Sequence, residues 1–404
     1  MSLGSKNYDF VIIGAGIIGL TIAHELRQRY PDQSVLLLEK ELSVGLHGSG
    51  RNSGVLHSGI YYPPDSYKAK FCAQGRQALS AFCLEHDLPF REIGKILIPT
   101  RVEEDAQLDV LYERGGQNGV IAERLTDADL RKIEPEARSA TGKALFVRVT
   151  SIANPKSVIK KLASVLVDGG VSIQYAASDL YFDVKNRRVR SAGTEFSYGM
   201  LINTAGLHAD TVAHQFNIGR DYTLMPFKGL YWKLDPLSGI KLNHLIYPVP
   251  DLRVPFLGVH STTNTEGDVY FGPTAVPAFG RENYRYFDDV NLSDTPKIMK
   301  LLALQLLAGR DGFRRLAWQE GRRYLKPWFW QAARRIVPRL KMEHLLSCDK
   351  VGIRAQMYHI PSGRLANDFV VEKGENSVHI LNAISPAWTC SFPFAKMVVE
   401  QYLK

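Results

Sequence analysis

The feature that most constrains the fold of this chain is a glycine-rich turn between two apolar runs near its start. Residues 8–13 (YDFVII) form a β-branched run that is typical of a strand buried on both faces. The turn GAGIIG at 14–19 follows it at once, and apolar residues then recur with helical spacing as far as Leu26. A second apolar run, residues 35–38, ends at Glu39. This order predicts a βαβ unit that binds a dinucleotide.

Each residue type in this turn suits that role. Gly14 permits the tight turn, Gly16 lets the backbone approach a pyrophosphate, and Gly19 lets helix and strand pack closely. The N–H groups of the helix that begins near Ile17 would then face the phosphates. Glu39 stands twenty residues after Gly19, where its carboxylate accepts hydrogen bonds from ribose hydroxyls and repels a 2′-phosphate. NADP is therefore disfavoured.

The composition narrows the class of protein. Of the 404 residues, 45% are hydrophobic and 23% are charged, which excludes collagen-like and mostly disordered chains. None of the four cysteines lies in a CxxC pair or at zinc-finger spacing from a histidine, so neither a disulfide framework nor a structural zinc site is expected. No other metal-ligand cluster and no Ser-His-Asp pattern stands out. The start of the chain lacks a secretory signal, and its apolar stretch at 10–23 is too short to span a bilayer. We therefore expect a cytoplasmic protein without a metal ion.

A second glycine-rich segment follows the second apolar run. Residues 45–62 are dense in Gly, Ser and Asn, contain Arg51, and are flanked by histidine and tyrosine. Such a loop offers N–H groups and hydroxyls to phosphate and ribityl oxygens. The alternative interpretation is an ordinary surface loop.

The run from Arg51 to Tyr62 resembles the flavin-contacting segment of the FAD-dependent D-amino-acid-oxidase (DAO) superfamily. Within it, the chain is similar to the L-2-hydroxyglutarate dehydrogenase/oxidase family. Motifs in order along nearly the whole chain carry this resemblance: Cys72, KIL at 95–97, NPK at 154–156, INTAGL at 202–207, PFKG at 226–229, YPVPD at 247–251, PFLGVH at 255–260, FGP at 271–273, GIRAQ at 352–356 and NAISPA at 382–387. Arg51 and Trp388 depart from the family pattern, which has His and a smaller residue there.

The predicted fold class is α/β (α+β), with a Rossmann-like FAD-binding domain interleaved with a substrate-binding domain on a mixed or antiparallel sheet. The predicted FAD-binding domain is discontinuous and comprises residues 1–85, 146–215 and 346–404. The predicted substrate-binding domain comprises residues 86–145 and 216–345, which are richer in Pro, Tyr and Phe and contain strand-like alternation. We expect the ligand at the domain interface. Local patterns add a strand at 171–175, hairpin strands at 180–196 with a turn at Asn186-Arg187, a strand at 200–206, and a final helix that Ser385 caps and that runs to 402.

The resemblance implies FAD that is bound without a covalent link. Cys390 could attach a flavin on chemistry alone, but no such bond is expected. The expected cofactor-binding residues lie in the fingerprint, after the second strand, in the loop that follows, in the 204–206 run and at the start of the final helix: Gly14, Gly16, Ile17, Ile18, Gly19, Glu39, Lys40, Ser49, Gly50, Arg51, Asn52, Ser53, Gly54, Ser178, Thr204, Ala205, Gly206, Arg354, Ser385, Pro386, Ala387, Trp388 and Thr389.

Oxidation of a 2-hydroxy acid by a flavin needs a cation for the carboxylate and a base for the hydroxyl proton, with the Cα hydrogen facing flavin N5 for hydride transfer. His57, which follows the glycine-rich loop, is the first candidate for the base, and His260 is the second. Each histidine equally suits a structural role. Arg354 lies in an apolar run, where an unpaired charge would be costly, so it is the candidate carboxylate clamp. Further candidates for substrate contact are Arg253, Lys228 and Tyr62.

A basic segment at 310–341 carries ten cations against two carboxylates, a balance of +8 within a formal net charge of +9. Arginine and tryptophan mixed on helical segments suit an anionic membrane surface, so one interpretation of this segment is peripheral contact with the inner face of the cytoplasmic membrane and with a quinone. The alternative is a solvated helical face whose aromatic residues belong to the core. Nucleic acid is not expected, because no recognition motif accompanies the charge.

The leading hypothesis is an FAD-dependent enzyme that oxidises a 2-hydroxy acid, above all L-2-hydroxyglutarate to 2-oxoglutarate, and passes electrons to a quinone or oxygen. Arg51 and Trp388 motivate an alternative substrate, an amino acid or N-methyl amine such as glycine, sarcosine or proline. A flavin-bound protein without turnover that binds a membrane or polyanion is an alternative of another class. An NAD-linked dehydrogenase is a further, less favoured alternative.

Overall fold

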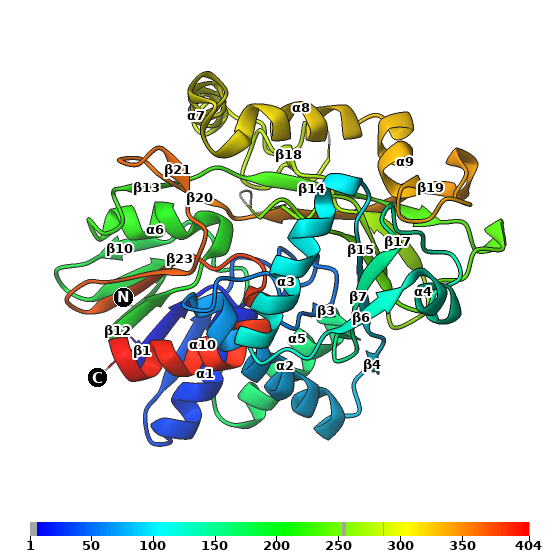
Figure 1. The fold of residues 1–404 in the computed structure, drawn as a ribbon. Helices are drawn as coiled ribbons and strands as arrows, with labels where there is room; N and C mark the ends of the chain where they lie inside the picture. The colour runs from blue at the N-terminus through cyan, green and yellow to red at the C-terminus, as the bar shows by residue number, and fades with distance from the viewer. Residues whose placement is uncertain (1–5, 253–255, 286, 404) are drawn as a thin grey trace. The chain divides into compact units, whose positions relative to one another are not determined.

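The computed structural model describes residues 6–252, 256–285 and 287–403 (Figure 1). The chain divides into two compact units, each assembled from separate stretches. Unit 1 contains the chain up to Asn52, Pro155–Pro226 and the chain from Arg354, and unit 2 contains Ser53–Asn154 and Phe227–Ile353. These boundaries differ from the predicted ones: residues 53–85, 146–154 and 346–353 lie in unit 2, and 216–226 lie in unit 1. The difference arises because a segment's unit depends on the sheet that its strands join, which local patterns do not encode.

Among the described residues of unit 1, eight strands form one sheet in the order β10-β11-β12-β1-β2-β9, with β23 beside β12 and β22 beside β23. The strands β1, β2, β9, β12 and β23 run parallel where they pair, and the β10-β11-β12 and β22-β23 pairs are antiparallel. The bounds are β1 (Lys6–Ile13), β2 (Val35–Leu38), β9 (Ser172–Gln174), β10 (Tyr181–Asp183), β11 (Arg188–Ser191), β12 (Thr194–Asn203), β22 (Val370–Lys373) and β23 (Ser377–Asn382). A smaller sheet pairs β13 (Tyr222–Leu224), β20 (Met357–His359) and β21 (Arg364–Leu365).

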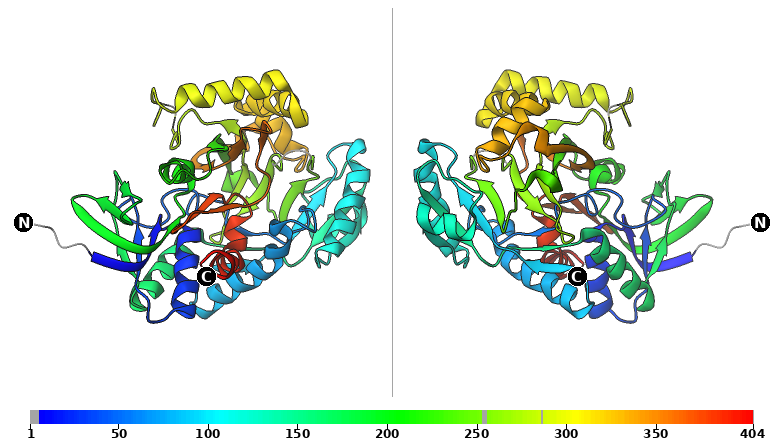
Figure 2. Two further views of the ribbon diagram at one scale, coloured as in Figure 1. Left: turned by 90° about the vertical axis from the view of Figure 1, so that its left-hand side faces the viewer. Right: turned by 90° about the vertical axis from the view of Figure 1, so that its right-hand side faces the viewer.

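The helices of unit 1 are α1 (Ile17–Arg29), α5 (Pro155–Asp168), α6 (Ala209–Gln215) and α10 (Ala387–Tyr402). Helix α1 packs against α5 and α10, and the views in Figure 2 show α1 and α10 side by side. The predicted βαβ unit, the strand β9 that joins its sheet and the final helix are confirmed. The prediction that Ser385 caps α10 is wrong, because Pro386 occupies the N-cap and makes no side-chain capping bond.

The segment 180–196, predicted to form hairpin strands with one turn, contains parts of three strands in the structure. It contains two turns, one between β10 and β11 and one between β11 and β12. Arg187 and Ala192 adopt φ values of 53° and 45°, which reverse the chain twice. Such left-handed conformations are uncommon for residues with a Cβ, so the pattern predicted one turn fewer.

Unit 2 contains three sheets within its described residues. One has the antiparallel order β16-β17-β14-β18 with β19 beside β14, a second has the mixed order β15-β5-β7-β6, and the third is β3-β8-β4. The predicted mixed or antiparallel architecture is confirmed. The strand bounds are β3 (Val55–Leu56), β4 (Phe90–Glu92), β5 (Lys95–Ile98), β6 (Glu123–Thr126), β7 (Lys143–Val147), β8 (Ser151–Ala153), β14 (Phe227–Leu234), β15 (Leu245–Pro248), β16 (His260–Thr263), β17 (Val269–Gly272), β18 (Val276–Pro277) and β19 (Leu345–Arg354).

The helices of unit 2 are α2 (Tyr67–Glu85), α3 (Asp105–Gln117), α4 (Asp127–Ile133), α7 (Thr295–Ala308), α8 (Phe313–Arg323) and α9 (Lys326–Arg334). Strand β5 separates two apolar clusters because its side chains alternate between its faces. Ile96 and Ile98 join the cluster that contains Phe329, whereas Leu97 joins the cluster that contains Tyr61 and Tyr247. No helix of the described chain is both long and apolar enough to cross a bilayer.

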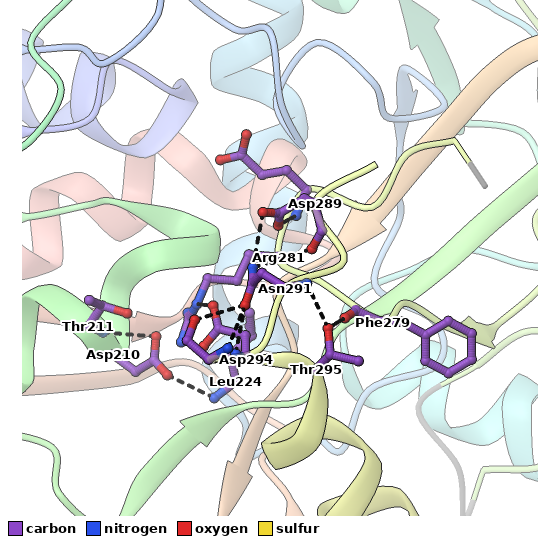
Figure 3. A network of polar contacts seen from close by, with 11 residues as sticks. Asp210, Thr211, Leu224, Phe279, Arg281, Asp289, Asn291, Asp294 and Thr295 are labelled. Atoms are coloured by element: carbon purple, nitrogen blue, oxygen red, sulfur yellow. Dashed lines mark hydrogen bonds and ion pairs between the residues drawn. The ribbon is translucent and has the colours of Figure 1, made fainter. Parts of the chain in front are cut away.

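Buried or partly buried polar side chains fix loops in each unit, and Figure 3 shows them from close by. In unit 1, the carboxylate of Asp210 accepts hydrogen bonds from Leu224 N at 3.0 Å and Thr211 N at 2.9 Å. In unit 2, Arg281 Nε donates to Asp294 Oδ2 at 3.1 Å, and Thr295 Oγ1 donates to Phe279 O at 2.6 Å. The second pair of contacts holds the start of α7 against the loop that precedes it.

Acidification is expected to destabilise unit 1 through His379 of β23. This side chain is 0% exposed; Asn203 Nδ2 donates to its Nδ1 over 3.2 Å, and its Nε2 donates to Ser377 Oγ over 3.0 Å. Burial lowers the pKa of His379 from 6.5 to about 4. The unfolded chain therefore binds more protons between these values, so the stability from neutral His379 is complete above pH 6.5 and is lost as pH falls towards 4. The loss is up to about 3 kcal/mol.

Chemical denaturation at several pH values checks this. The variant His379→Gln is expected to show a flatter dependence of unfolding free energy on pH across that window. His359→Gln, at a partly exposed histidine of β20, is the matched control and should keep the wild-type slope. An unchanged slope in His379→Gln would contradict the assignment.

Candidate functional site

The glycine-rich turn of unit 1 is a place where three strand ends meet. Gly14 has φ +97°, and its N–H donates to Leu38 O at 2.8 Å. A Cβ on Gly14 would lie 2.8 Å from Thr204 O, and a Cβ on Gly19 would lie 2.1 Å from Gly14 O. Both contacts are with backbone atoms, so neither glycine can be replaced without moving a strand or the helix. The φ of Gly14 fits the tight turn predicted there, and the contact of Gly19 with Gly14 O fits the close packing predicted for Gly19.

The start of α1 has no capping side chain at its N-cap residue. The N-cap residue Gly16 makes no side-chain capping bond, and Ile17 N donates instead to Ser49 Oγ at 2.9 Å. A Cβ on Gly16 would lie 3.0 Å from that hydroxyl oxygen. The first turn of α1 carries no acidic residue of its own, so the partial positive charge of the helix favours an anion there. This arrangement fits a pyrophosphate beside Gly16, Ile17, Ile18 and Ser49.

Glu39 is positioned by backbone hydrogen bonds at the end of β2. Its Oε2 accepts from Ala15 N at 2.8 Å, its Oε1 accepts from Glu41 N at 3.0 Å, and its side chain is buried. The carboxylate is therefore fixed beside the glycine-rich turn with further lone pairs for ribose hydroxyls. The neighbouring Lys40 forms an ion pair with Glu41, which is also bonded to His47.

The loop after β2 closes on itself. Asn52 Nδ2 donates to Ser49 O at 2.5 Å, and Arg51 Nε donates to Leu46 O at 2.7 Å. A Cβ on Gly50 would lie 2.1 Å from Gly45 O, so this glycine allows the close turn. Residues 45–52 thus form a compact loop of unit 1 rather than an open surface loop. Ser53 and Gly54, also predicted for the cofactor, lie in unit 2.

The end of β12 joins the same region of unit 1. Thr204 Oγ1 lies 2.8 Å from Ile13 O and 2.9 Å from Gly14 O, and Ala205 N donates to Asn203 Oδ1 at 3.1 Å. The structure therefore brings the predicted 204–206 run beside the fingerprint. Ser178 lies near Glu39 through its neighbour, because Ala177 N donates to Glu39 O at 2.8 Å.

The start of α10 supplies a buried donor in unit 1. Trp388 is buried, and its Nε1 has no hydrogen-bond partner among the residues that the model describes. An orphaned indole N–H at the start of a helix fits an acceptor atom of a ligand. The predicted residues Ser385, Pro386, Ala387 and Thr389 flank it. Arg354 stands where β19 ends, with Gln356 N donating to its carbonyl oxygen at 2.9 Å.

The predicted base candidates both lie buried in unit 2. His57 follows β3, and its carbonyl oxygen accepts from Cys72 Sγ at 3.1 Å. His260 begins β16, its ring stacks on Tyr247 with centroids 3.8 Å apart, and its Nδ1 donates to Gly258 O at 2.8 Å. Burial lowers the pKa of His260 to about 4, so its ring is neutral at pH 7. Since a carbonyl oxygen only accepts, the proton sits on Nδ1 and Nε2 is an acceptor.

The remaining predicted substrate contacts are more scattered. Lys228 is buried on β14, its Nζ donates to Asn283 Oδ1 at 3.0 Å, and burial lowers its pKa. Tyr62 lies edge-on to Tyr61 with ring centroids 6.4 Å apart. Arg253 lies outside the described residues.

Lys95 was not among the predicted site residues. Lys95 is 0% exposed, and its Nζ lies 4.4 Å from the ring centroid of Tyr61 and 5.3 Å from that of Tyr247. Burial lowers the pKa of Lys95 to about 7. The sequence signal for a buried cation is that Lys95 stands at the head of the apolar run KIL. This run entered the predictions only as a motif of the family resemblance. Tyr247 was likewise named only within a motif. Its contact with Lys95 could not be predicted, because the two residues are far apart in the chain.

Nearly the whole chain matches one protein family and its members. A family model described as FAD dependent oxidoreductase (DAO) matches residues 9–401. The chain is 36% identical over 405 residues to L-2-hydroxyglutarate dehydrogenase of Escherichia coli (strain K12), covering 98% of this chain and 93% of that protein. It is 34% identical over 417 residues to the mitochondrial L-2-hydroxyglutarate dehydrogenase of Mus musculus, covering 96% of this chain and 87% of that protein.

Solved structures show the same fold. L-alpha-glycerophosphate oxidase from Mycoplasma pneumoniae, reduced and with FAD bound, superposes with a TM-score of 0.74 at 22% identity, covering 98% of this chain and 94% of that one. Glycine oxidase from Geobacillus kaustophilus superposes with a TM-score of 0.70 at 17% identity, with the same coverage. At these identities the likeness concerns the fold.

Proposed function

We propose, from the premise that this chain belongs to the FAD dependent oxidoreductase (DAO) family, that it oxidises L-2-hydroxyglutarate to 2-oxoglutarate. The predicted family and FAD cofactor are confirmed, and the protein is an FAD-dependent oxidoreductase. One observation carries the choice of substrate: the identity to curated L-2-hydroxyglutarate dehydrogenases covers 98% of the chain, and so extends over both units. The membership also removes the NAD-linked and non-catalytic alternatives.

The residues of unit 1 hold the cofactor in this proposal. The N–H groups at the start of α1 bind the pyrophosphate, Glu39 accepts from ribose hydroxyls, and the N–H of Trp388 donates to an acceptor atom of the flavin. FAD supplies the hydride acceptor when it is bound. Helix α10, with 16 residues, begins beside Trp388, so its partial positive charge favours negative charge on the reduced cofactor.

The proposed roles in the reaction fall on three polar side chains. His57 accepts the proton of the 2-hydroxyl group while the Cα hydrogen leaves as hydride, so that the C–O bond becomes a carbonyl. Arg354 binds the carboxylate beside the reacting carbon, because a guanidinium pairs with carboxylate bidentately. Neutral His260 presents Nε2 as an acceptor and is the second candidate for the base.

An anaerobic titration tests the proposed substrate. The purified protein is expected to carry a flavin whose visible absorption is bleached by L-2-hydroxyglutarate and left unchanged by D-2-hydroxyglutarate. Glycine, sarcosine and proline form the parallel series, because Arg51 and Trp388 motivated an amine substrate. Bleaching by one of these amines, without bleaching by L-2-hydroxyglutarate, would replace the proposed substrate. Admitting oxygen or a soluble quinone after reduction then identifies which acceptor reoxidises the flavin.

We further propose that the basic segment 310–341 contacts an anionic membrane surface. Phe313 and Phe329 are buried, so part of the aromatic content belongs to the core, as the alternative interpretation held. Trp318 is 68% exposed, however, and Leu307 at the end of α7 is 74% exposed. Arg322 lies 3.3 Å from the ring centroid of Trp328, so cation and aromatic groups lie together. Exposed apolar groups beside arginines suit a lipid headgroup region.

Sedimentation with lipid vesicles checks the membrane proposal. Replacing the exposed Arg315 and Arg335 with glutamine is expected to weaken binding to vesicles that contain phosphatidylglycerol by about 30-fold, because each cation contributes about 1 kcal/mol near such a surface. The control replaces the exposed Lys185 and Lys373 of unit 1 with glutamine and removes the same charge elsewhere. Equal losses in both variants would show a net-charge effect and contradict contact through this segment.

A further inference from the structure

The amino group of Lys95 lies in the apolar interior of unit 2 without a hydrogen-bonding partner among the described residues, and an anionic ligand would favour its protonated form. Lys95 begins β5 and is 0% exposed, and its Nζ has no hydrogen-bond acceptor in the part of the chain that the model describes. Its neighbours are the aromatic ring faces of Tyr61 and Tyr247, at 4.4 and 5.3 Å from Nζ to the centroids. Aromatic ring faces attract an ammonium group, but they do not accept conventional hydrogen bonds from its N–H groups as an oxygen atom does.

The same two tyrosines carry further polar groups without partners in the described chain. Both hydroxyl oxygens are buried, and neither has a hydrogen-bond partner within the described residues. Burial raises the pKa of Tyr61 and of Tyr247, so both hydroxyls keep their protons. The ring of His260 stacks on Tyr247 and is neutral at pH 7, so it does not repel the ammonium form of Lys95.

Buried polar groups in folded proteins are almost always hydrogen-bonded, because an orphaned group loses its hydration without any compensating bond. Three orphaned groups that can donate, two of them on the rings that lie beside Lys95 Nζ, therefore indicate a ligand with acceptor atoms. An ionised carboxylate has two acceptor oxygens and the opposite charge to Lys95, and it meets both requirements.

We infer that Lys95, with the hydroxyl groups of Tyr61 and Tyr247, binds the distal carboxylate of the dicarboxylate substrate and so determines the preference for a five-carbon dicarboxylic acid. This inference rests on the proposed function and adds a specificity-determining residue to it. Lys95 suits the carboxylate remote from the reacting carbon, because Arg354 is proposed for the carboxylate beside that carbon and the methylene groups of the substrate fit the apolar cluster that contains Tyr61 and Tyr247. The tyrosine rings of that cluster then contact the methylene groups of the substrate.

Binding of non-reacting acids tests the inference without turnover. Glutarate carries both carboxylates and butyrate carries one, and the perturbation of the flavin spectrum reports the dissociation constant of each. The variant Lys95→Met keeps the length of the side chain and removes the ammonium group. It is expected to weaken glutarate binding by about 30-fold, the loss typical of a charged hydrogen bond, and to change butyrate binding by less than about threefold. Lys350→Met is the matched control, because Lys350 also lies over two tyrosine rings, at 5.1 and 4.3 Å.

Thermal unfolding separates a binding role from a structural one. Without ligand, Lys95→Met is expected to melt at or above the wild-type temperature, because an orphaned buried charge has been removed, and glutarate should raise the melting temperature of the wild type alone. Equal weakening of glutarate and butyrate, or glutarate binding that matches Lys350→Met, would overturn the assignment. Failure of L-2-hydroxyglutarate to bleach wild-type flavin would instead count against the proposed function, so the two failures are distinguishable.

Discussion

Replacing His57 with glutamine is expected to slow anaerobic reduction of the flavin by L-2-hydroxyglutarate by about 10²–10⁴-fold. Glutamine retains hydrogen-bonding groups but cannot take up the proton that leaves the 2-hydroxyl group. His57 is buried directly after β3, and its backbone is held by the Cys72 thiol, so the main chain should not move. Stopped-flow absorbance gives the reduction rate, and the flavin content of the purified variant should equal that of the wild type.

The comparison with His260 makes this prediction specific. Burial lowers the pKa of His260 to about 4, which makes its ring a weak base at neutral pH. We therefore expect His260→Gln to slow reduction by less than His57→Gln does. His359→Gln, at a partly exposed histidine of unit 1, should leave the rate unchanged. A larger loss in His260→Gln than in His57→Gln would transfer the role of base to His260.

Replacing Gly19 with alanine is expected to abolish most FAD binding and to destabilise unit 1 by about 3 kcal/mol or more. The added Cβ would lie 2.1 Å from Gly14 O and 2.7 Å from Thr204 Oγ1, both far inside contact distance. Because Gly14 O is a backbone atom between β1 and α1, relief requires the helix to move away from the pyrophosphate site. Flavin absorbance per protein and the midpoint of chemical unfolding measure the two effects.

The matched control for that variant is Gly116→Ala. Gly116 lies within α3, and a Cβ there would meet no atom within 4 Å. Alanine is favoured over glycine within a helix by about 0.5–1 kcal/mol, so this variant should keep its flavin and be at least as stable as the wild type. Retention of full flavin content by Gly19→Ala would contradict the close packing that the model shows.

The cofactor side of the protein could be predicted from the sequence to a large extent. The strand β1, the turn and the helix α1 follow each other without interruption, so periodicity and three glycines define them locally. The remote run at 204–206 was placed through a family resemblance, and its contact with the fingerprint depends on the parallel pairing of β1 with β12. Pairing between strands so far apart in the chain is not encoded in either segment alone.

The substrate side was predicted less completely. Histidines and arginines were selected for their chemistry, whereas Lys95 and Tyr247 were quoted only as parts of motifs. Their contact exists because β15 pairs with β5, with Tyr247 opposite Leu97. Tyr61 reaches the same place from a loop outside both strands. No spacing along the chain links these three residues, so their shared environment was not predictable from patterns.

The sequence by itself determined the dinucleotide fingerprint, the family and the position of the basic segment, because each depends on residues that are neighbours in the chain or on an ordered series of motifs. The tertiary structure decided which polar groups are buried together and which are left without partners. It also decided which segments join each unit, since Ser53–Asn154 enters unit 2 through its strand pairings. The physical reason is that burial and pairing are properties of contacts between distant segments, and these contacts exist only after the chain has folded.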